Sequence, residues 1–219
     1  MIHIFEKFIM KGKFIVIEGL DGAGKSTQVD LLKQYFEKKD IPFQFVHFPK
    51  MNAGVYGTLV AEFLRGEFGS LENVHPKLVA LLFANDRLEH IHTINQWLAD
   101  GFVVLADRYV NSNIAFQCAK LTDEQEKQKL RDWILDFEFK TNLLPQPDYN
   151  LFLDVPFDAI IRSLSKDRVG DDRDYLDGKS IFMRHLLIFK KRCIKSICKW
   201  WKTKMVLLLL IAVMRKGLS

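Results

Sequence analysis

Residues 19–27 form a glycine-rich stretch whose residue types bind phosphate. They follow the apolar run at residues 14–17 and fit the pattern G-x-x-x-x-G-K-[ST]. Glycines let successive backbone N–H groups surround phosphate oxygens, and the helix that follows directs its positive end at the same anion. Lys25 is then expected to contact the β- and γ-phosphates, and Ser26 to bind Mg²⁺. The residues expected to bind a nucleoside triphosphate here are Gly19, Leu20, Asp21, Gly22, Ala23, Gly24, Lys25, Ser26 and Thr27.

A carboxylate and a guanidinium, Asp107 and Arg108, follow the apolar run at residues 102–106. Asp107 is suited to hold Mg²⁺ through water, and Arg108 to bind an acceptor phosphate with both arms of its guanidinium. Without a phosphate-binding loop in the same chain, an ion pair that caps a strand would explain the two residues equally well. With such a loop, they are expected to belong to the same site.

Two further groups of residues suit a nucleotide site. Phe83 and Arg87 are four residues apart in a helical pattern and share a face, so an aromatic plane lies beside a fork of donors, as a nucleobase requires. On its own, such a pair is more often core plus solvated charge. The charged segment at residues 165–173 suits a lid that brings Arg168 and Arg173 to the transferred phosphate. As a bare charge run it is more typical of a solvated loop.

The pattern along the chain predicts alternating strands and helices. Strands are expected at residues 13–18, 42–48, 102–106 and 149–153, and helices at residues 25–39, 56–64, 76–100, 123–140 and 156–165. Such an alternation predicts an α/β fold with a parallel sheet, right-handed crossovers and helices on both faces. Ligands then bind at the carboxyl ends of the strands. Asp21, Phe48, Asp107 and Asp154 fall at those ends.

Length and composition predict one soluble domain in a reducing cytoplasm. The chain has 219 residues, of which 48% are hydrophobic, and its three cysteines provide no disulfide framework. Residues 1–9 are too short and too charged for a signal peptide, and Met10 is expected to be the natural start.

In their order along the chain, these motifs resemble the thymidylate kinase family, which makes dTDP from dTMP with ATP and Mg²⁺. The resemblance covers about residues 11–178. It rests on residues 19–27, 48–49, 82–87 and 107–109 and on the arginines of the 165–178 lid. It implies a P-loop NTPase fold of three layers with about five strands, and a homodimer that binds neither nucleic acid nor membrane.

The resemblance also implies roles for individual residues. Phe83 would stack on thymine and Arg87 would hydrogen-bond the base; Asn113 would contact the thymine edge. Asp21 would bind the sugar 3′-hydroxyl, and Phe116 would lie under the deoxyribose. The residues expected to bind dTMP are Asp21, Phe48, Phe83, Arg87, Arg108, Ser112, Asn113 and Phe116; those expected to act in catalysis are Lys25, Arg108, Arg168 and Arg173; those expected to bind Mg²⁺ are Ser26 and Asp107.

Two positions distinguish this chain within the family's pattern, and one of them, Lys50, is a departure from it. Gly22 stands where some members carry an arginine, so this chain resembles the branch that supplies arginines from the lid. Lys50 stands where the family usually has an arginine after Phe-Pro. It can provide a point charge but not a two-armed contact with phosphate.

Residues 179–219 differ in character from residues 1–178. From residue 178 onward there are 11 Lys or Arg and no Asp or Glu, and residues 205–214 form an apolar run about half as long as a membrane span. A short anchor and a buried strand are two explanations. We expect a third: a one-base deletion near the codons for Ser180 and Ile181. Permitted codons in the other frame encode an acidic amphipathic helix and an apolar strand. The chain would then lack its last strand, and its activity would be weakened.

Other functions remain open from sequence alone. A deoxynucleoside kinase also combines a phosphate loop with an Asp-Arg pair, but it needs an acidic base soon after the second strand, and here no acid occurs between Lys50 and Glu62. A P-loop protein that binds nucleotide without phosphate transfer is a second alternative. A nucleic-acid or membrane adaptor that uses its basic tail is a third.

Overall fold

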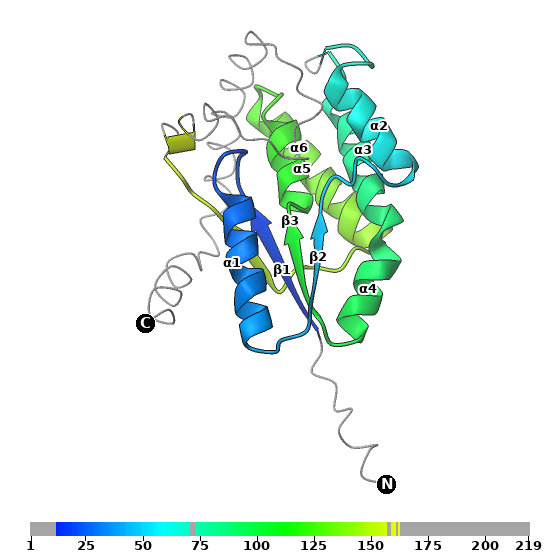
Figure 1. Cartoon of the computed structure of the whole chain (residues 1–219). Helices are drawn as coiled ribbons and strands as arrows, with labels where there is room; N and C mark the ends of the chain where they lie inside the picture. The colour runs from blue at the N-terminus through cyan, green and yellow to red at the C-terminus, as the bar shows by residue number, and fades with distance from the viewer. Residues whose placement is uncertain (1–11, 71–72, 157–158, 161, 163–219) are drawn as a thin grey trace.

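A computed structural model describes residues 12–70, 73–156, 159–160 and 162 of the chain (Figure 1). Its strands are β1 (Lys13–Glu18), β2 (Phe43–His47), β3 (Val103–Asp107) and β4 (Tyr149–Phe152). Its helices are α1 (Lys25–Lys38), α2 (Gly54–Arg65), α3 (Pro76–Glu89), α4 (Ile91–Ala99), α5 (Val110–Cys118) and α6 (Glu124–Leu135), and α6 continues into a π-helical turn, η2 (Asp136–Thr141). The predicted α/β class is confirmed.

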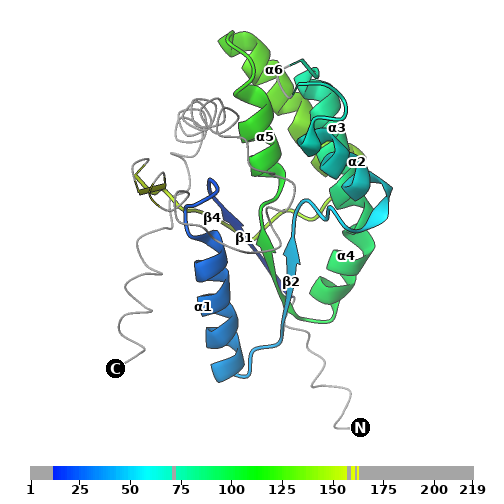
Figure 2. The same ribbon diagram turned by 45° about the horizontal axis from the view of Figure 1, so that its top comes forward.

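The described strands form one parallel sheet in the order β2-β3-β1-β4. Asp107 of β3 is in register with Ile17 of β1 on one side and His47 of β2 on the other. The carboxyl ends of these three strands therefore lie at one level. The loops after β1 and β3 leave the sheet side by side at this level, toward α1 and α5 (Figure 2).

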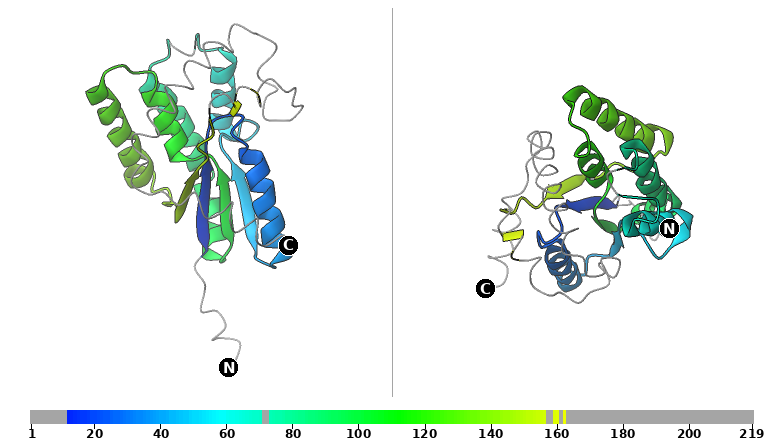
Figure 3. Two further views of the ribbon diagram at one scale, coloured as in Figure 1. Left: turned by 90° about the vertical axis from the view of Figure 1, so that its left-hand side faces the viewer. Right: turned by 90° about the horizontal axis from the view of Figure 1, so that it is seen from above.

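Alternate residues of β1 build the core on the two faces of the sheet. Ile17 packs in a cluster with Val29, Leu32 and Phe36 of α1, which recur at helical spacing on one side of that helix. Phe14 and Val16 instead join the cluster that α3 to α6 contribute. Viewed from above, α1 lies on one side of the strands and the green helices α5 and α6 lie on the other (Figure 3). The sheet is thus a middle layer, as predicted.

Two helical predictions need correction, and one helix was missed. The helix expected at residues 76–100 is two helices with a break at His90, which lets α3 pack on α2 and α5 while α4 packs on β3. Helix α5 was not predicted, because six of its nine residues are buried and it has no clear polar face. The helix expected at residues 123–140 changes to π geometry at Asp136.

Several predictions fall on parts of the chain outside the described residues. These are most of the helix expected at residues 156–165, the lid at residues 165–178 with Arg168 and Arg173, and the tail at residues 179–219. The expected absence of a last strand belongs to the same region.

Candidate nucleotide-binding site

The loop between β1 and α1 has the backbone conformation that its glycines allow. Gly22 and Gly24 have φ angles of 84° and 85°, in the left-handed region where a side chain would be strained. Gly24 is also the N-cap of α1, so the first N–H groups of this helix point into the loop. The loop is therefore shaped to bind an anion through backbone donors.

Lys25 lies within this loop and is almost completely buried. Its Nζ donates to the backbone oxygen of Leu20 at 3.2 Å and is 4.0 Å from Asp21 Oδ1. Burial lowers the pKa of Lys25 to about 8, and the charge of Arg108 adds to this effect, while nearby carboxylates oppose it. A phosphate group placed here would stabilise the charged form of Lys25.

Asp107 lies at the end of β3 with one carboxylate oxygen available. Oδ2 is 3.3 Å from His47 Nδ1, whereas the buried Oδ1 has no hydrogen-bond partner among the described residues. Burial alone would raise the pKa of Asp107, but the hydrogen bond with His47 and the charges of Lys25 and Arg108 outweigh it and lower this pKa. Asp107 is therefore negatively charged, and its Oδ1 can still accept a hydrogen bond.

Asp107 and Ser26 are suited to a Mg²⁺ ion that has only one or two protein ligands. Ser26 is exposed in the first turn of α1, where its hydroxyl can approach a bound phosphate. In the part of the chain that the structure describes, no group of three or more His, Cys, Asp or Glu side chains could hold a metal ion. A Mg²⁺ ion bound by one or two protein groups, water and phosphate oxygens needs no such group.

Arg108 connects the end of β3 to the phosphate loop. It has a φ of 69°, and its backbone N–H donates to Ile17 O at 2.9 Å. Its Nη2 donates to Asp21 Oδ1 at 2.5 Å and its Nη1 to Ser112 Oγ at 3.1 Å, while the guanidinium lies 5.3 Å from the centre of the Phe116 ring. Four residues predicted to bind dTMP are thus brought together: Asp21, Arg108, Ser112 and Phe116.

Neighbouring carboxylates keep Arg108 positively charged. Burial alone would lower the pKa of Arg108, but the carboxylates of Asp21, Asp107 and Glu18 outweigh burial and raise it. The Arg108 side chain is only 11% exposed. A permanent positive charge with fixed orientation therefore lies beside the phosphate loop, as an acceptor phosphate would require.

Glu18, which sequence reasoning missed, holds Tyr109 and Ser112 next to Arg108 through hydrogen bonds. One of its oxygens accepts from the backbone N–H groups of Tyr109 and Ser112, at 3.1 and 3.2 Å, and the other accepts from Ser112 Oγ. Burial raises the pKa of this carboxyl. The signal in the sequence was an acidic residue that ends an apolar strand immediately before the phosphate loop.

Arg87 and Asn113 are also brought together, and both contact a third residue, Glu138. Arg87 Nε and Nη2 each donate to a Glu138 oxygen at 2.5 Å, and Asn113 Nδ2 donates to Glu138 Oε1 at 2.9 Å and to Ala80 O at 3.0 Å. Asn113 Oδ1 is buried and has no hydrogen-bond partner within the described ranges. Phe83 is partly buried one turn before Arg87 on α3. Sequence reasoning found Arg87 and Asn113 but not Glu138.

The structure places Phe48 deeper than a ligand-binding residue would be expected to lie. It is 1% exposed, and its ring centre is 6.1 Å from that of Tyr109 and 6.2 Å from that of His90. Its contact with dTMP stays a prediction.

Lys50, two residues after Phe48, is held through its backbone N–H, which is 3.2 Å from both carboxylate oxygens of the buried Asp86. Burial raises the pKa of Asp86 to about 6.

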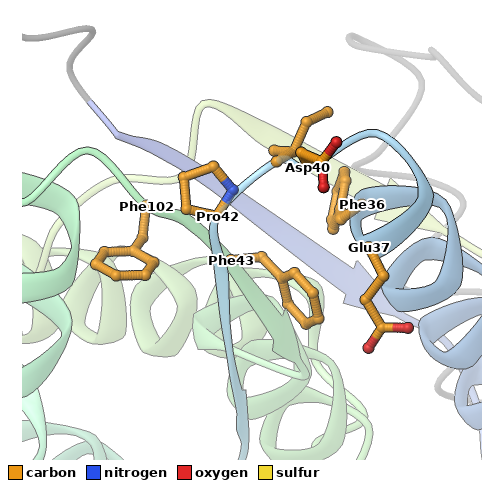
Figure 4. A pocket seen from close by; sticks show the side chains of 7 residues that line it. Phe36, Glu37, Asp40, Pro42, Phe43 and Phe102 are labelled. Carbon is orange, nitrogen blue, oxygen red and sulfur yellow. The ribbon is translucent and has the colours of Figure 1, made fainter.

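A shallow hollow of about 440 Å³ lies away from all of these residues. Phe36, Glu37, Asp40, Pro42, Phe43 and Phe102 line it, at the end of α1 and the starts of β2 and β3 (Figure 4). Since ligands of parallel α/β sheets bind at the carboxyl ends of the strands, this hollow is at the wrong end to be the nucleotide site. Within the described residues, every helix is too short or too polar to cross a bilayer.

Comparison with known proteins identifies the family. The family model for thymidylate kinase matches residues 17–185, which include the phosphate loop, Asp107, Arg108, Asn113 and Glu138. The chain belongs to the thymidylate kinase family.

Individual relatives agree with this thymidylate kinase assignment. A thymidylate kinase of Mycobacterium tuberculosis is 40% identical over 142 residues, which are 64% of this chain and 65% of that protein. A relative in Thermococcus gammatolerans is 36% identical over 159 residues, 70% of this chain and 71% of its own length. The solved structure of thymidylate kinase from Candida albicans matches with a TM-score of 0.61 and 29% identity, covering 85% of this chain and 78% of that one.

Proposed function

We propose that this chain transfers the γ-phosphate of ATP to dTMP and so makes dTDP, for dTTP synthesis in the cytoplasm. One observation carries the proposal: Lys25 and Arg108 both approach Asp21, at 4.0 and 2.5 Å, although they come from the loops after two different strands. Membership of the thymidylate kinase family supports the same conclusion. A donor phosphate on the loop and an acceptor phosphate at Arg108 would then be neighbours.

The proposed chemistry depends on position and charge. Lys25 neutralises the β- and γ-phosphates, while Arg108 orients the acceptor phosphate. Mg²⁺, near Ser26 and Asp107, would supply further positive charge to the phosphates. The phosphate of dTMP is already a nucleophile at neutral pH, so the reaction needs no general base. We assign Arg168 and Arg173, which lie outside the described residues, to the same transferred phosphate.

Residues around Asn113 would recognise the base of the acceptor nucleotide, and residues around Arg108 would recognise its sugar. Asn113 Oδ1 is a buried acceptor without a partner among the described residues, and the ring N3–H of thymine would satisfy it. Arg87 would donate to a thymine oxygen and Phe83 would stack on the ring. Asp21 would accept from the 3′-hydroxyl. Phe116, beneath Arg108, would leave little room for a 2′-hydroxyl.

We also propose that residues 179–219 arise from a shifted reading frame and that the intact protein is a homodimer packed through helices. The family match ends at residue 185, close to the change in composition, and this supports the first proposal. Sequencing the codons for residues 170–219 tests it: restoring one base should give an acidic helix and an apolar strand. The dimer is tested by light scattering on both versions of the chain.

Release of ADP from ATP and Mg²⁺ tests the proposed activity, with dTMP, thymidine or no acceptor present. Of these three conditions, only the one that contains dTMP should release ADP. Release with thymidine would indicate a deoxynucleoside kinase instead. Release that does not depend on an acceptor, or binding of ATP without ADP formation, would favour a P-loop protein that does not transfer phosphate.

A further inference from the structure

Glu138 is a fully buried carboxylate that joins three elements of the fold. It lies in η2 with 0% exposure, and its two oxygens accept from Arg87 of α3 and Asn113 of α5. The Arg87 contact is two-armed, which is the strongest and most directional geometry for this pair. Glu138 therefore fixes both side chains at once.

The backbone around Glu138 is irregular at this point. Helix α6 ends at Leu135, and in the π turn that follows Asn142 N donates to Phe137 O, five residues earlier. Asp136 and Lys140 in the same turn are exposed and form a surface ion pair, so Glu138 alone of the turn's charged residues points inward. Short π turns within helices are often found at functional sites.

The contacts of Asn113 determine which atom of its amide remains available. Nδ2 has two hydrogens, and Glu138 Oε1 and Ala80 O accept one each. Rotating the amide by 180° would place Oδ1 against two acceptors, neither of which can donate. Oδ1 is therefore held in the position that has no partner among the described residues, where it can accept a hydrogen bond.

We propose that Glu138 is a positioning residue that selects the base of the nucleotide. By holding the Asn113 amide in one orientation, Glu138 makes the site accept a pyrimidine with a ring N3–H, as in dTMP and dUMP. Cytosine has an acceptor at this ring position, so it would oppose Oδ1 with another acceptor and be rejected. This inference rests on the proposed function, since it concerns the base of the same acceptor nucleotide.

The test compares Glu138→Gln with the matched control Asp136→Asn, which removes an exposed carboxylate from the same turn. Calorimetry on the full chain would give Kd values for dTMP, dCMP and ATP with Mg²⁺. For Glu138→Gln we expect Kd for dTMP to rise about tenfold or more, the preference for dTMP over dCMP to fall, and Kd for ATP to stay unchanged. Asp136→Asn should change none of these values.

Equal weakening of dTMP and ATP would mean that Glu138 serves only the fold, and unchanged selectivity would also overturn the inference. If Glu138→Gln does not fold, Glu138→Asp keeps the charge and shortens the side chain. It should likewise weaken dTMP more than ATP, and a wild-type selectivity in that variant would overturn the inference. If the unsubstituted chain does not bind dTMP at all, the proposed function itself fails, which is a distinguishable result.

Discussion

The guanidinium of Arg108 donates to Asp21 Oδ1 at 2.5 Å and thereby joins the turn after β3 to the phosphate loop after β1. The same guanidinium donates to Ser112, whose hydroxyl in turn donates to Glu18. These four side chains form one connected network at the carboxyl ends of two adjacent strands. The network orients the group that is proposed to hold the acceptor phosphate.

Replacing Arg108 with lysine keeps the charge but removes the two-armed geometry. Lysine cannot donate to Asp21, Ser112 and a phosphate in one plane, so acceptor binding should suffer most. We expect KM for dTMP to rise about tenfold or more while KM for ATP stays within about twofold. Steady-state kinetics with each substrate varied would measure both. An equal effect on the two substrates would contradict the assigned role.

Replacing Lys25 with methionine should abolish most of the activity without unfolding the protein. Loss of one preorganised charge at a transferred phosphate typically lowers kcat about 10² to 10³-fold. The variant is expected to be at least as stable as the wild type at pH 7, because burial of the ammonium is unfavourable. Urea unfolding and the ADP-release assay provide the two measurements. Near-normal kcat in a folded variant would remove Lys25 from the mechanism.

The stability difference between the Lys25→Met variant and the wild type should depend on pH. The pKa of Lys25 is about 8 in the folded chain, below its ordinary value of 10.5. Between these values the unfolded chain binds more protons than the folded chain, so wild-type stability rises relative to the variant as pH rises from 8 to 10.5. Below pH 8 the difference should be constant. Parallel unfolding curves at pH 7, 9 and 10 would show this, and a difference that widens with pH would contradict it.

Glu18→Ala should destabilise the fold more than Glu18→Gln. Alanine leaves the N–H groups of Tyr109 and Ser112 and the Ser112 hydroxyl without their acceptor, and we expect a cost of about 3 kcal/mol or more. Glutamine retains one acceptor oxygen and carries no charge. Because burial raises the pKa of Glu18, the wild type should lose stability relative to Glu18→Gln as pH rises through this titration. Denaturation midpoints at pH 5 and 8 test both statements.

Asp107→Asn should change the Mg²⁺ requirement. Asp107 is expected to hold the ion through water, and loss of such an outer contact commonly reduces metal affinity about 10 to 100-fold. The Mg²⁺ concentration for half-maximal activity should rise by a similar factor, and kcat should partly recover at high Mg²⁺. An unchanged Mg²⁺ titration would exclude Asp107 from the metal site.

The phosphate loop and the strand ends could be predicted because local sequence determines them. Gly22, Gly24 and Lys25 are required by the conformation and charge of the loop itself, and Asp107 directly follows a buried strand. The parallel sheet was predictable for the same reason, since apolar runs without alternation are typical of buried parallel strands. The predicted neighbours Asp21 and Arg108, 87 positions apart, then followed from the sheet.

Features that depend on tertiary packing could not be predicted. The break at His90 has no proline or glycine to mark it, and it follows from the different partners of α3 and α4. Glu138 resembles any charged residue of a polar helix until the π turn directs it inward to Arg87. Phe48 was predicted as the last residue of a strand, but it lies just after β2 and packs against Tyr109 in the core.

The most direct test of the central claim is whether the γ-phosphate of ATP appears in dTDP. The full chain would be incubated with γ-labelled ATP, Mg²⁺ and dTMP, with Lys25→Met in parallel, and the nucleotides separated by chromatography. We predict label in dTDP that depends on both dTMP and Lys25, even if residues 179–219 make the rate low. Label released only as inorganic phosphate, or dTDP formed equally by the Lys25→Met variant, would contradict the account.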